Sequence, residues 1–169
     1  MSWNFATDTM NKAELLQRII DTLSLDLDVV QRAAQTAYEA ATAEENIAEN
    51  KYDTLGLEAS YLATGQARRM EEIRQARAAY QQLVVRDYDP ARGIQISNLV
   101  TLEAENGSCQ RLFLGPEGAG LKIGQGEQLI TVITPRSPLG QSLMGKAEDD
   151  EISLTLGAKQ QRFVVVEVS

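Results

Sequence analysis

The sequence predicts an α+β protein in two parts: residues 1–90 form an antiparallel coiled-coil hairpin, and residues 91–169 form a small β-sheet domain with one short helix. Two observations carry this prediction. Up to about residue 84, apolar and small residues recur at helical spacing, whereas beyond residue 93 apolar and polar residues alternate as they do in β-strands. Between the two patterns lie the turn-forming residues Pro90 and Gly93.

A heptad pattern between residues 11 and 45 predicts the first arm of the hairpin. Its spacings alternate between four and three residues, as in a coiled-coil seam. The seam positions are Leu16, Ile20, Leu23, Leu27, Val30, Ala34, Ala37 and Ala41. From about residue 58 to residue 84, a looser seam that includes Met70, Ile73, Tyr80 and Val84 predicts the second arm. Arginines of this arm form either a solvated flank or a partner contact: Arg68, Arg69, Arg74 and Arg77.

Acidic residues replace apolar ones at the predicted tip of the hairpin, residues 44–53. Glu44, Glu45, Glu49 and Asp53 lie here, and Ile47 is the one large aliphatic residue. These acids could solvate a loop and complement the positive N-terminus of the second helix. Alternatively, a slim probe could carry them into a narrow channel of a large partner, where one or two carboxylates could complete a weak magnesium site.

Composition argues against several classes of protein. A net charge of −8 disfavours a broad grip on phosphate backbones, so we expect no direct sequence-specific DNA binding. The absence of histidine removes the commonest general base and the commonest zinc ligand. The chain has no apolar run that could cross a bilayer and no signal-peptide pattern, so we expect a cytoplasmic protein without a membrane partner. The single Cys109 is interpreted as a small strand residue.

Alternating segments in the C-terminal half predict five strands, near residues 99–104, 110–114, 128–134, 151–156 and 162–168. Between the first two, Asn106 and Gly107 predict a tight hairpin turn, because both residues tolerate positive φ. A short helix is expected after residue 136, since Ser137 can cap it, Pro138 suits its first position and Gly145 suits its end.

Residues 128–151 resemble the C-terminal domain of the bacterial Gre (GreA/GreB-like) transcription elongation factors. In that family a strand runs into Ser-Pro, a short helix, Gly-Lys and an acidic pair before the next strand, and here Ser137-Pro138, Gly145-Lys146 and Asp149-Asp150 follow this order. The resemblance extends to the hairpin, because residues 49–52 (Glu-Asn-Lys-Tyr) are similar to the family's tip motif Glu-Asn-x-x-Tyr with one residue fewer.

The resemblance implies a fold and a partner for the C-terminal domain. The family's domain is FK506-binding-protein-like (FKBP-like) and docks at the rim of the secondary channel of RNA polymerase. Carried over to this chain, the partner-binding residues are Ser137, Pro138, Asp149 and Asp150.

The resemblance also implies a role for the tip, which in the family reaches down the channel and helps hold a magnesium ion in the polymerase active site. The residues that carry over are Glu49, with Glu45 or Asp53, and Glu49 would be a metal ligand only in the complex. The polymerase itself then cleaves backtracked RNA. The chain is thus expected to be no enzyme on its own, to have no cofactor of its own, and to meet nascent RNA only through the polymerase.

The tip departs from the family pattern at one position. Cleavage-active members have an aspartate three residues before the tip glutamate, where this chain has Asn46, a poorer magnesium ligand. Weak cleavage stimulation is therefore expected, and a channel-binding regulator without cleavage stimulation is the alternative. Two further classes stay open: a coiled-coil adapter or chaperone, and a prolyl isomerase, which the scarcity of aromatic residues beyond residue 90 disfavours. Residues 115–126 are glycine-rich but lack the spacing of a nucleotide-binding loop.

Overall fold

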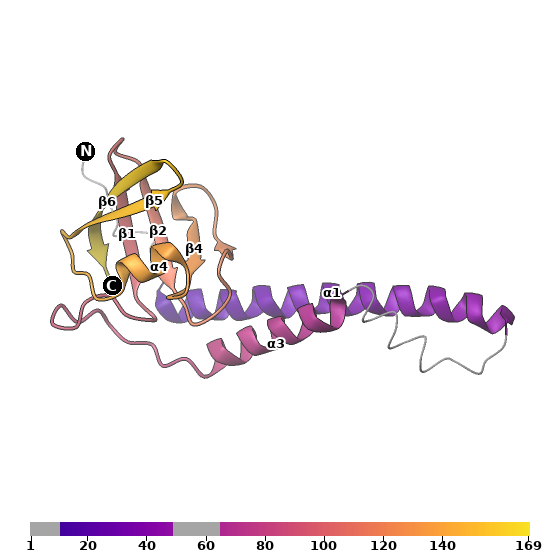
Figure 1. Ribbon diagram of the computed structural model, residues 1–169. Helices are drawn as coiled ribbons and strands as arrows, with labels where there is room; N and C mark the ends of the chain where they lie inside the picture. The colour runs from indigo at the N-terminus through magenta and orange to yellow at the C-terminus, as the bar shows by residue number, and fades with distance from the viewer. Residues whose placement is uncertain (1–10, 49–64) are drawn as a thin grey trace. The chain divides into compact units, whose positions relative to one another are not determined.

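The computed structural model describes residues 11–48 and 65–169, with the side chains of residues 41–48 outside the description (Figure 1). The chain divides into two compact units. One unit comprises residues 20–78, and the other comprises the chain up to residue 19 together with residues 79–169. The first helix begins in one unit and continues in the other.

Two helices supply the first unit: α1, Lys12–Ala48, and α3, Gln66–Gln81. The side-chain oxygen of Asn11 accepts a hydrogen bond of 2.8 Å from the backbone N–H of Glu14, which caps the start of α1. Apolar residues of both helices are buried, and Arg77 on α3 approaches the hydroxyl of Ser24 on α1 at 3.5 Å. No helix in the described ranges has the length and apolar character that a membrane-spanning helix requires.

The heptad register of the first arm is confirmed at Leu23, Leu27 and Ala34, whereas Val30 and Ala37 are only partly buried and the first two turns are wrong. Leu23 is buried as expected, whereas the fully buried residues before it are Leu15 and Ile19, and the expected Leu16 and Ile20 are partly exposed. The reason is that residues up to Ile19 belong to the unit of the sheet. This part of α1 therefore turns a different face to its neighbours than the part that follows the heptad pattern.

A mixed sheet of six strands forms the second unit, in the order β3-β4-β2-β1-β6-β5. Strands β2 and β4 pair in parallel, and all other pairs are antiparallel. The strands are β1 Leu99–Ala104, β2 Cys109–Leu114, β3 Lys122–Ile123, β4 Ile130–Ile133, β5 Glu151–Leu156 and β6 Lys159–Val168. A 3₁₀ turn, Gly126–Gln128, precedes β4, and a short helix α4, Pro138–Leu143, lies between β4 and β5.

The α+β fold class is confirmed, and so are all five expected strands and the short helix. The strand that the sequence missed is β3, which has only two residues and therefore no alternating pattern. The FKBP-like character of the sheet domain and the coiled-coil character of the hairpin stay predictions.

The hairpin between β1 and β2 forms where expected, with a different turn. Gly107 has a φ of +83°, and Asn106 does not share the left-handed conformation. The backbone N–H of Gly107 instead bonds the carbonyl of Ala104 at 2.9 Å, and the side-chain oxygen of Asn106 accepts from the N–H of Ser108 at 3.0 Å. Asn106 thus contributes through its side chain.

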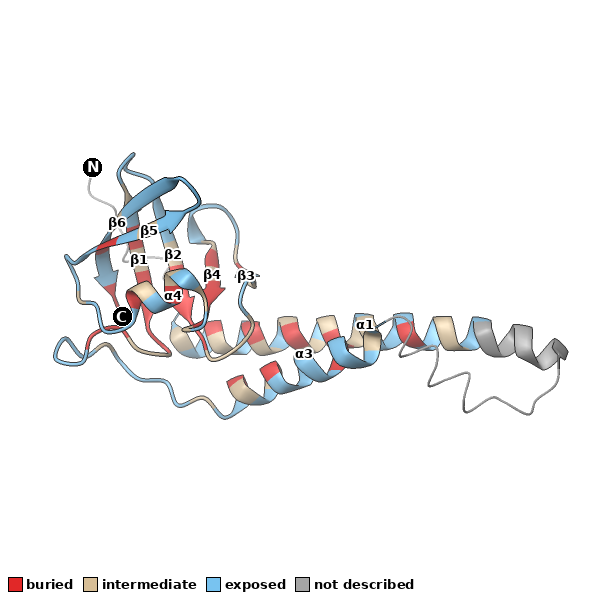
Figure 2. Cartoon of the chain, in the orientation of Figure 1, coloured by how far each residue is buried: buried red, intermediate tan, exposed pale blue. Residues whose placement is uncertain are grey.

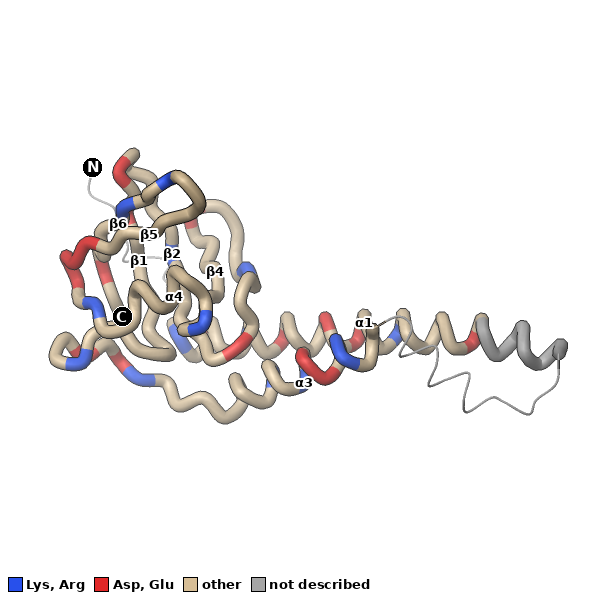
Figure 3. Tube along the Cα trace, in the orientation of Figure 1, with Lys and Arg blue, Asp and Glu red and all other residues tan. Residues whose placement is uncertain are grey.

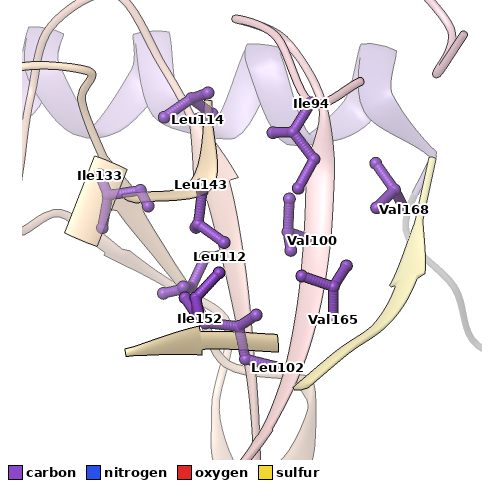
Figure 4. Packing of buried hydrophobic residues seen from close by; sticks show 10 residues of the cluster. All are labelled: Ile94, Val100, Leu102, Leu112, Leu114, Ile133, Leu143, Ile152, Val165 and Val168. Atoms are coloured by element: carbon purple, nitrogen blue, oxygen red, sulfur yellow. The ribbon is translucent and has the colours of Figure 1, made fainter. Parts of the chain in front are cut away.

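One hydrophobic cluster of this unit lies on the face of the sheet that α4 and the segment before β1 cover, while other residues, such as Phe113 and Val132, are buried outside it. Ten buried side chains form the cluster (Figure 4): Ile94, Val100, Leu102, Leu112, Leu114, Ile133, Leu143, Ile152, Val165 and Val168. Leu143 of α4 is fully buried in it. Figure 2 shows the buried residues concentrated in β1, β2 and β4, whereas β5 is largely exposed. The core therefore depends on α4 being held against the sheet.

Substitutions at two neighbouring residues at the end of α4, one buried and one partly exposed, should differ in their effect on the free energy of unfolding. Leu143→Ala should lower the free energy of unfolding by about 2–5 kcal/mol, because it opens a cavity in the core. Met144, which is 39% exposed, is the matched control, and Met144→Ala should change stability by less than about 1 kcal/mol. Urea unfolding measures both; equal losses in the two variants would mean that α4 is not packed as described.

Candidate partner-binding site

The four predicted partner-binding residues lie at the two ends of one connection between β4 and β5. Ser137 and Pro138 begin α4, and Asp149 and Asp150 end the segment that follows it. The hydrogen bonds of Ser137 run to Thr134 and Gly140, whereas those of Asp149 and Asp150 run to Ala147 and Val165.

Ser137 is a structural residue of the turn that starts α4. Its hydroxyl accepts from the backbone N–H of Gly140 at 3.1 Å and donates to the carbonyl of Thr134 at 2.8 Å. Gly140 is required here, because an added Cβ would overlap the carbonyl oxygen of Thr134. The Ser137 hydroxyl is therefore occupied within the chain, and the exposed Pro138 is the residue of this pair that a partner can contact.

The acidic segment before β5, visible in Figure 3, has two carboxylates that accept hydrogen bonds from the backbone and one, that of Asp149, that faces solvent. Asp150 accepts from the backbone N–H of Ala147 at 2.8 Å, and Glu148 accepts from the N–H of Val168 at 3.1 Å, so both hold the local backbone. Asp149 has a φ of +71°, and its backbone N–H bonds the carbonyl of Val165 at 2.7 Å, while its side chain is exposed. Asp149 is thus the acid of the predicted pair that can meet a partner.

An apolar groove beside the end of α4 was not predicted from the sequence. It encloses about 360 Å³ and is lined by Leu83, Val84, Arg86, Gln95, Ile96 and Met144. Val84 is 70% exposed, so its assignment to the buried seam of the second arm was wrong. The reason is that α3 ends at Gln81, and the following residues leave the helix before the heptad spacing reaches Val84.

Backbone contacts fix the two segments that line the groove to each other. The N–H of Gly145 bonds the carbonyl of Ile94 at 2.9 Å, and the N–H of Ile94 bonds the carbonyl of Lys146 at 2.8 Å. Gly93 has a φ of +78°, and an added Cβ there would overlap the backbone of Gly145. The segment after α3 is held as well, because the N–H of Arg86 donates to the buried hydroxyl of Ser97 at 2.8 Å.

The glycine-rich segment that follows β2 surrounds Tyr80. This side chain is almost fully buried, and its hydroxyl donates a hydrogen bond of 2.6 Å to the carbonyl of Glu117. At Gly115 an added Cβ would overlap the Tyr80 hydroxyl, so the missing side chain makes room for the ring. Burial, followed by the charge of Glu117, raises the pKa of Tyr80 well above its usual range, so the phenol stays a hydrogen-bond donor at ordinary pH.

The predicted tip acids cannot be placed. Glu45 lies in the last turns of α1 with its side chain outside the description, and Glu49 and Asp53 lie outside the described residues. Within the described ranges, no group of three or more Cys, Asp or Glu residues is arranged to hold a metal ion. The roles of Glu49, Glu45 and Asp53 stay predictions.

The buried phenol should make stability sensitive to alkaline pH. Because the folded pKa of Tyr80 lies above the unfolded value of about 10, its contribution to stability is complete below about pH 10 and is lost as pH rises further. Between about pH 10 and about pH 11 the wild type should lose about 1 kcal/mol more than Tyr80→Phe, which has no phenol to ionise. Urea unfolding across this range measures the difference, and parallel losses would contradict it.

Comparisons with known proteins point to one family. Residues 89–169 match the family described as "Transcription elongation factor, GreA/GreB, C-term". No curated protein matches the chain. Gfh1 of Thermus aquaticus is similar in structure at 21% identity, with 88% of this chain and 92% of that chain covered and a TM-score of 0.37. A GreA/GreB transcription elongation factor from Nitrosomonas europaea is also 21% identical, with 57% and 78% covered and a TM-score of 0.33.

Both TM-scores are below 0.5, so the assignment rests on the C-terminal match. That match covers the whole sheet of the second unit, α4 and the acidic segment before β5. It includes the Ser-Pro, Gly-Lys and Asp-Asp order from which the resemblance was recognised. Residues 89–169 of this chain therefore form a domain of the family of GreA/GreB C-terminal domains, which occur in transcription elongation factors.

Proposed function

We propose that this protein binds core RNA polymerase at the secondary channel and modulates backtracked transcription complexes. The observation that carries the proposal is an exposed apolar groove in the unit of the family-matched domain, beside the segment that carries the family motif. The partner is the one that family membership suggests. Binding there would place the protein in the cytoplasm, and nascent RNA would be reached only through the polymerase.

The docking surface consists of Val84, Ile96, Pro138, Met144 and Asp149. Exposed apolar residues such as Val84 and Met144 mark interaction sites when they gather around a groove. Asp149 adds one exposed charge. Its backbone is fixed by two hydrogen bonds, from the N–H of Asp149 to the carbonyl of Val165 and from the N–H of Val165 to the carbonyl of Asp150. The backbone that carries the charge is therefore ordered before binding. An apolar centre with a polar margin is the composition that stable protein interfaces have.

The tip acids supply the second half of the proposal. Glu49, with Glu45 or Asp53, would add carboxylate oxygen to a magnesium ion that belongs to the polymerase active site. Mg²⁺ retains several waters and needs few protein carboxylates, so one or two acids brought from outside would suffice. The protein on its own would then be no enzyme and would need no cofactor.

A regulator that occupies the channel without stimulating cleavage is the second candidate. Asn46 favours it, because an amide oxygen at the position of the family's acid binds Mg²⁺ more weakly than a carboxylate does. The two candidates share the docking surface and differ only in what the tip does.

Substitutions in the docking surface should weaken polymerase binding without unfolding the domain. Met144→Ser should lower affinity for core RNA polymerase by roughly fivefold or more, as central interface residues do, and Asp149→Asn should lower it by a smaller factor, because Asp149 belongs to the margin. Asparagine suits the positive φ of Asp149, so only the charge changes. Leu156→Ser, on β5, is the matched control, because Leu156 is 56% exposed but lies outside the docking surface. Fluorescence anisotropy measures affinity; equal effects at Leu156 and Met144 would refute the placement.

Substitutions at the tip should separate binding from cleavage. Glu49→Gln keeps the shape and removes the charge, so transcript cleavage by backtracked polymerase should fall by at least about tenfold with affinity nearly unchanged. Asn46→Asp should raise cleavage above the wild-type level, because it adds an anionic oxygen. A wild type without measurable stimulation and no gain in Asn46→Asp would leave the channel-occupying regulator. Loss of affinity in Glu49→Gln would instead make the tip acids docking contacts.

A further inference from the structure

The segment from Gly115 to Leu121 is a glycine-containing loop whose conformation is stabilised by contacts with other parts of the chain. Gly118 and Gly120 both have positive φ, and glycines give a loop more conformational freedom than other residues do. The ends of the loop are fixed to β4, because the N–H of Gly115 bonds Ile133 at 2.8 Å and the N–H of Gly120 bonds Val132 at 2.9 Å. Between these ends, Tyr80 holds the carbonyl of Glu117.

Glu117 connects this loop to the corner that begins α4. Its backbone carbonyl accepts from Tyr80, and its carboxylate forms an ion pair of 2.6 Å with the guanidinium of Arg136. Arg136 directly precedes Ser137 and Pro138, and its side chain is 70% exposed. An exposed ion pair adds little to stability, but this short contact is also a charge-assisted hydrogen bond, which orients the guanidinium toward Glu117.

We propose that Tyr80 is a positioning residue for the docking surface: it holds Glu117, Glu117 holds Arg136, and the fixed Arg136 guanidinium meets an acidic group of the partner beside Pro138. This inference rests on the proposed function. It gives the glycine-rich segment a role, since Gly115 makes room for the Tyr80 ring and the loop presents the Glu117 carbonyl to it. It also predicts that part of the binding affinity depends on a buried residue that no partner can touch.

A double-mutant cycle on polymerase binding tests the chain of contacts. Tyr80→Phe removes one hydroxyl and keeps the ring, so it should weaken affinity for core RNA polymerase roughly three- to tenfold, the range of one lost hydrogen bond. Arg136→Gln should weaken it by a similar factor. In the Arg136→Gln background, Tyr80→Phe should have no further effect, because the residue through which it acts is gone. Leu156→Ser, on β5 and outside the docking surface, is the control and should leave affinity unchanged.

Hydrogen exchange in the free protein supplies a readout that does not depend on the polymerase. Tyr80→Phe should speed exchange of the amides in residues 116–121 and 134–137, whereas β1 should exchange as in the wild type. Equal losses of affinity in the two backgrounds would overturn the proposal and make Tyr80 a purely structural residue, as would unchanged exchange in both segments. A wild type that does not bind core RNA polymerase would overturn the proposed function and the docking role of Tyr80 together, while exchange would still show whether Tyr80 holds the loop.

Discussion

The close approach of two backbones, at Gly93 and Gly145, is the constraint on which the rest of the sheet domain depends. It joins the segment that follows α3 to the segment that follows α4, and the paired hydrogen bonds of Ile94 with Gly145 and Lys146 lock the contact. Ile94 and Leu143, on the two sides of this contact, are both fully buried in the core. Val84 and Ile96 come from one segment and Met144 from the other, so the groove exists only while the contact holds. The same backbone contact therefore joins two segments of the core and the two segments that line the groove.

Much of the sheet domain could be predicted from the sequence, because its signals are local. The alternating pattern of β1 and the capping residues Ser137 and Pro138 specify their elements without help from the rest of the chain. The two-residue β3 could not be predicted, because it owes its strand conformation to pairing with β4. The register of the first two turns of α1 also depends on a distant element, which no spacing within the helix reveals.

The sequence pointed to a segment as the candidate site but could not assign separate roles to its residues. Asp149 and Asp150 look equivalent in the sequence and both are exposed, and it is the hydrogen bond from Ala147 to the Asp150 carboxylate that marks Asp150 as the acid that holds the local backbone. Val84 was misplaced because the end of α3 at Gln81 carries no glycine or proline that marks it in the sequence. The glycine-rich segment lacks the spacing of a nucleotide-binding loop, and its contact with Tyr80 could not be predicted because it joins residues far apart in the chain.

The central claim is that the family-matched domain docks on core RNA polymerase through the groove and its margin. Hydrogen–deuterium exchange of the full chain, with and without core RNA polymerase, tests it most directly. The account predicts slower exchange on binding in residues 83–86, 95–96 and 138–149, with the turn between β5 and β6 unchanged. Protection at that turn with none around Met144, or no protection anywhere in residues 79–169, would contradict it.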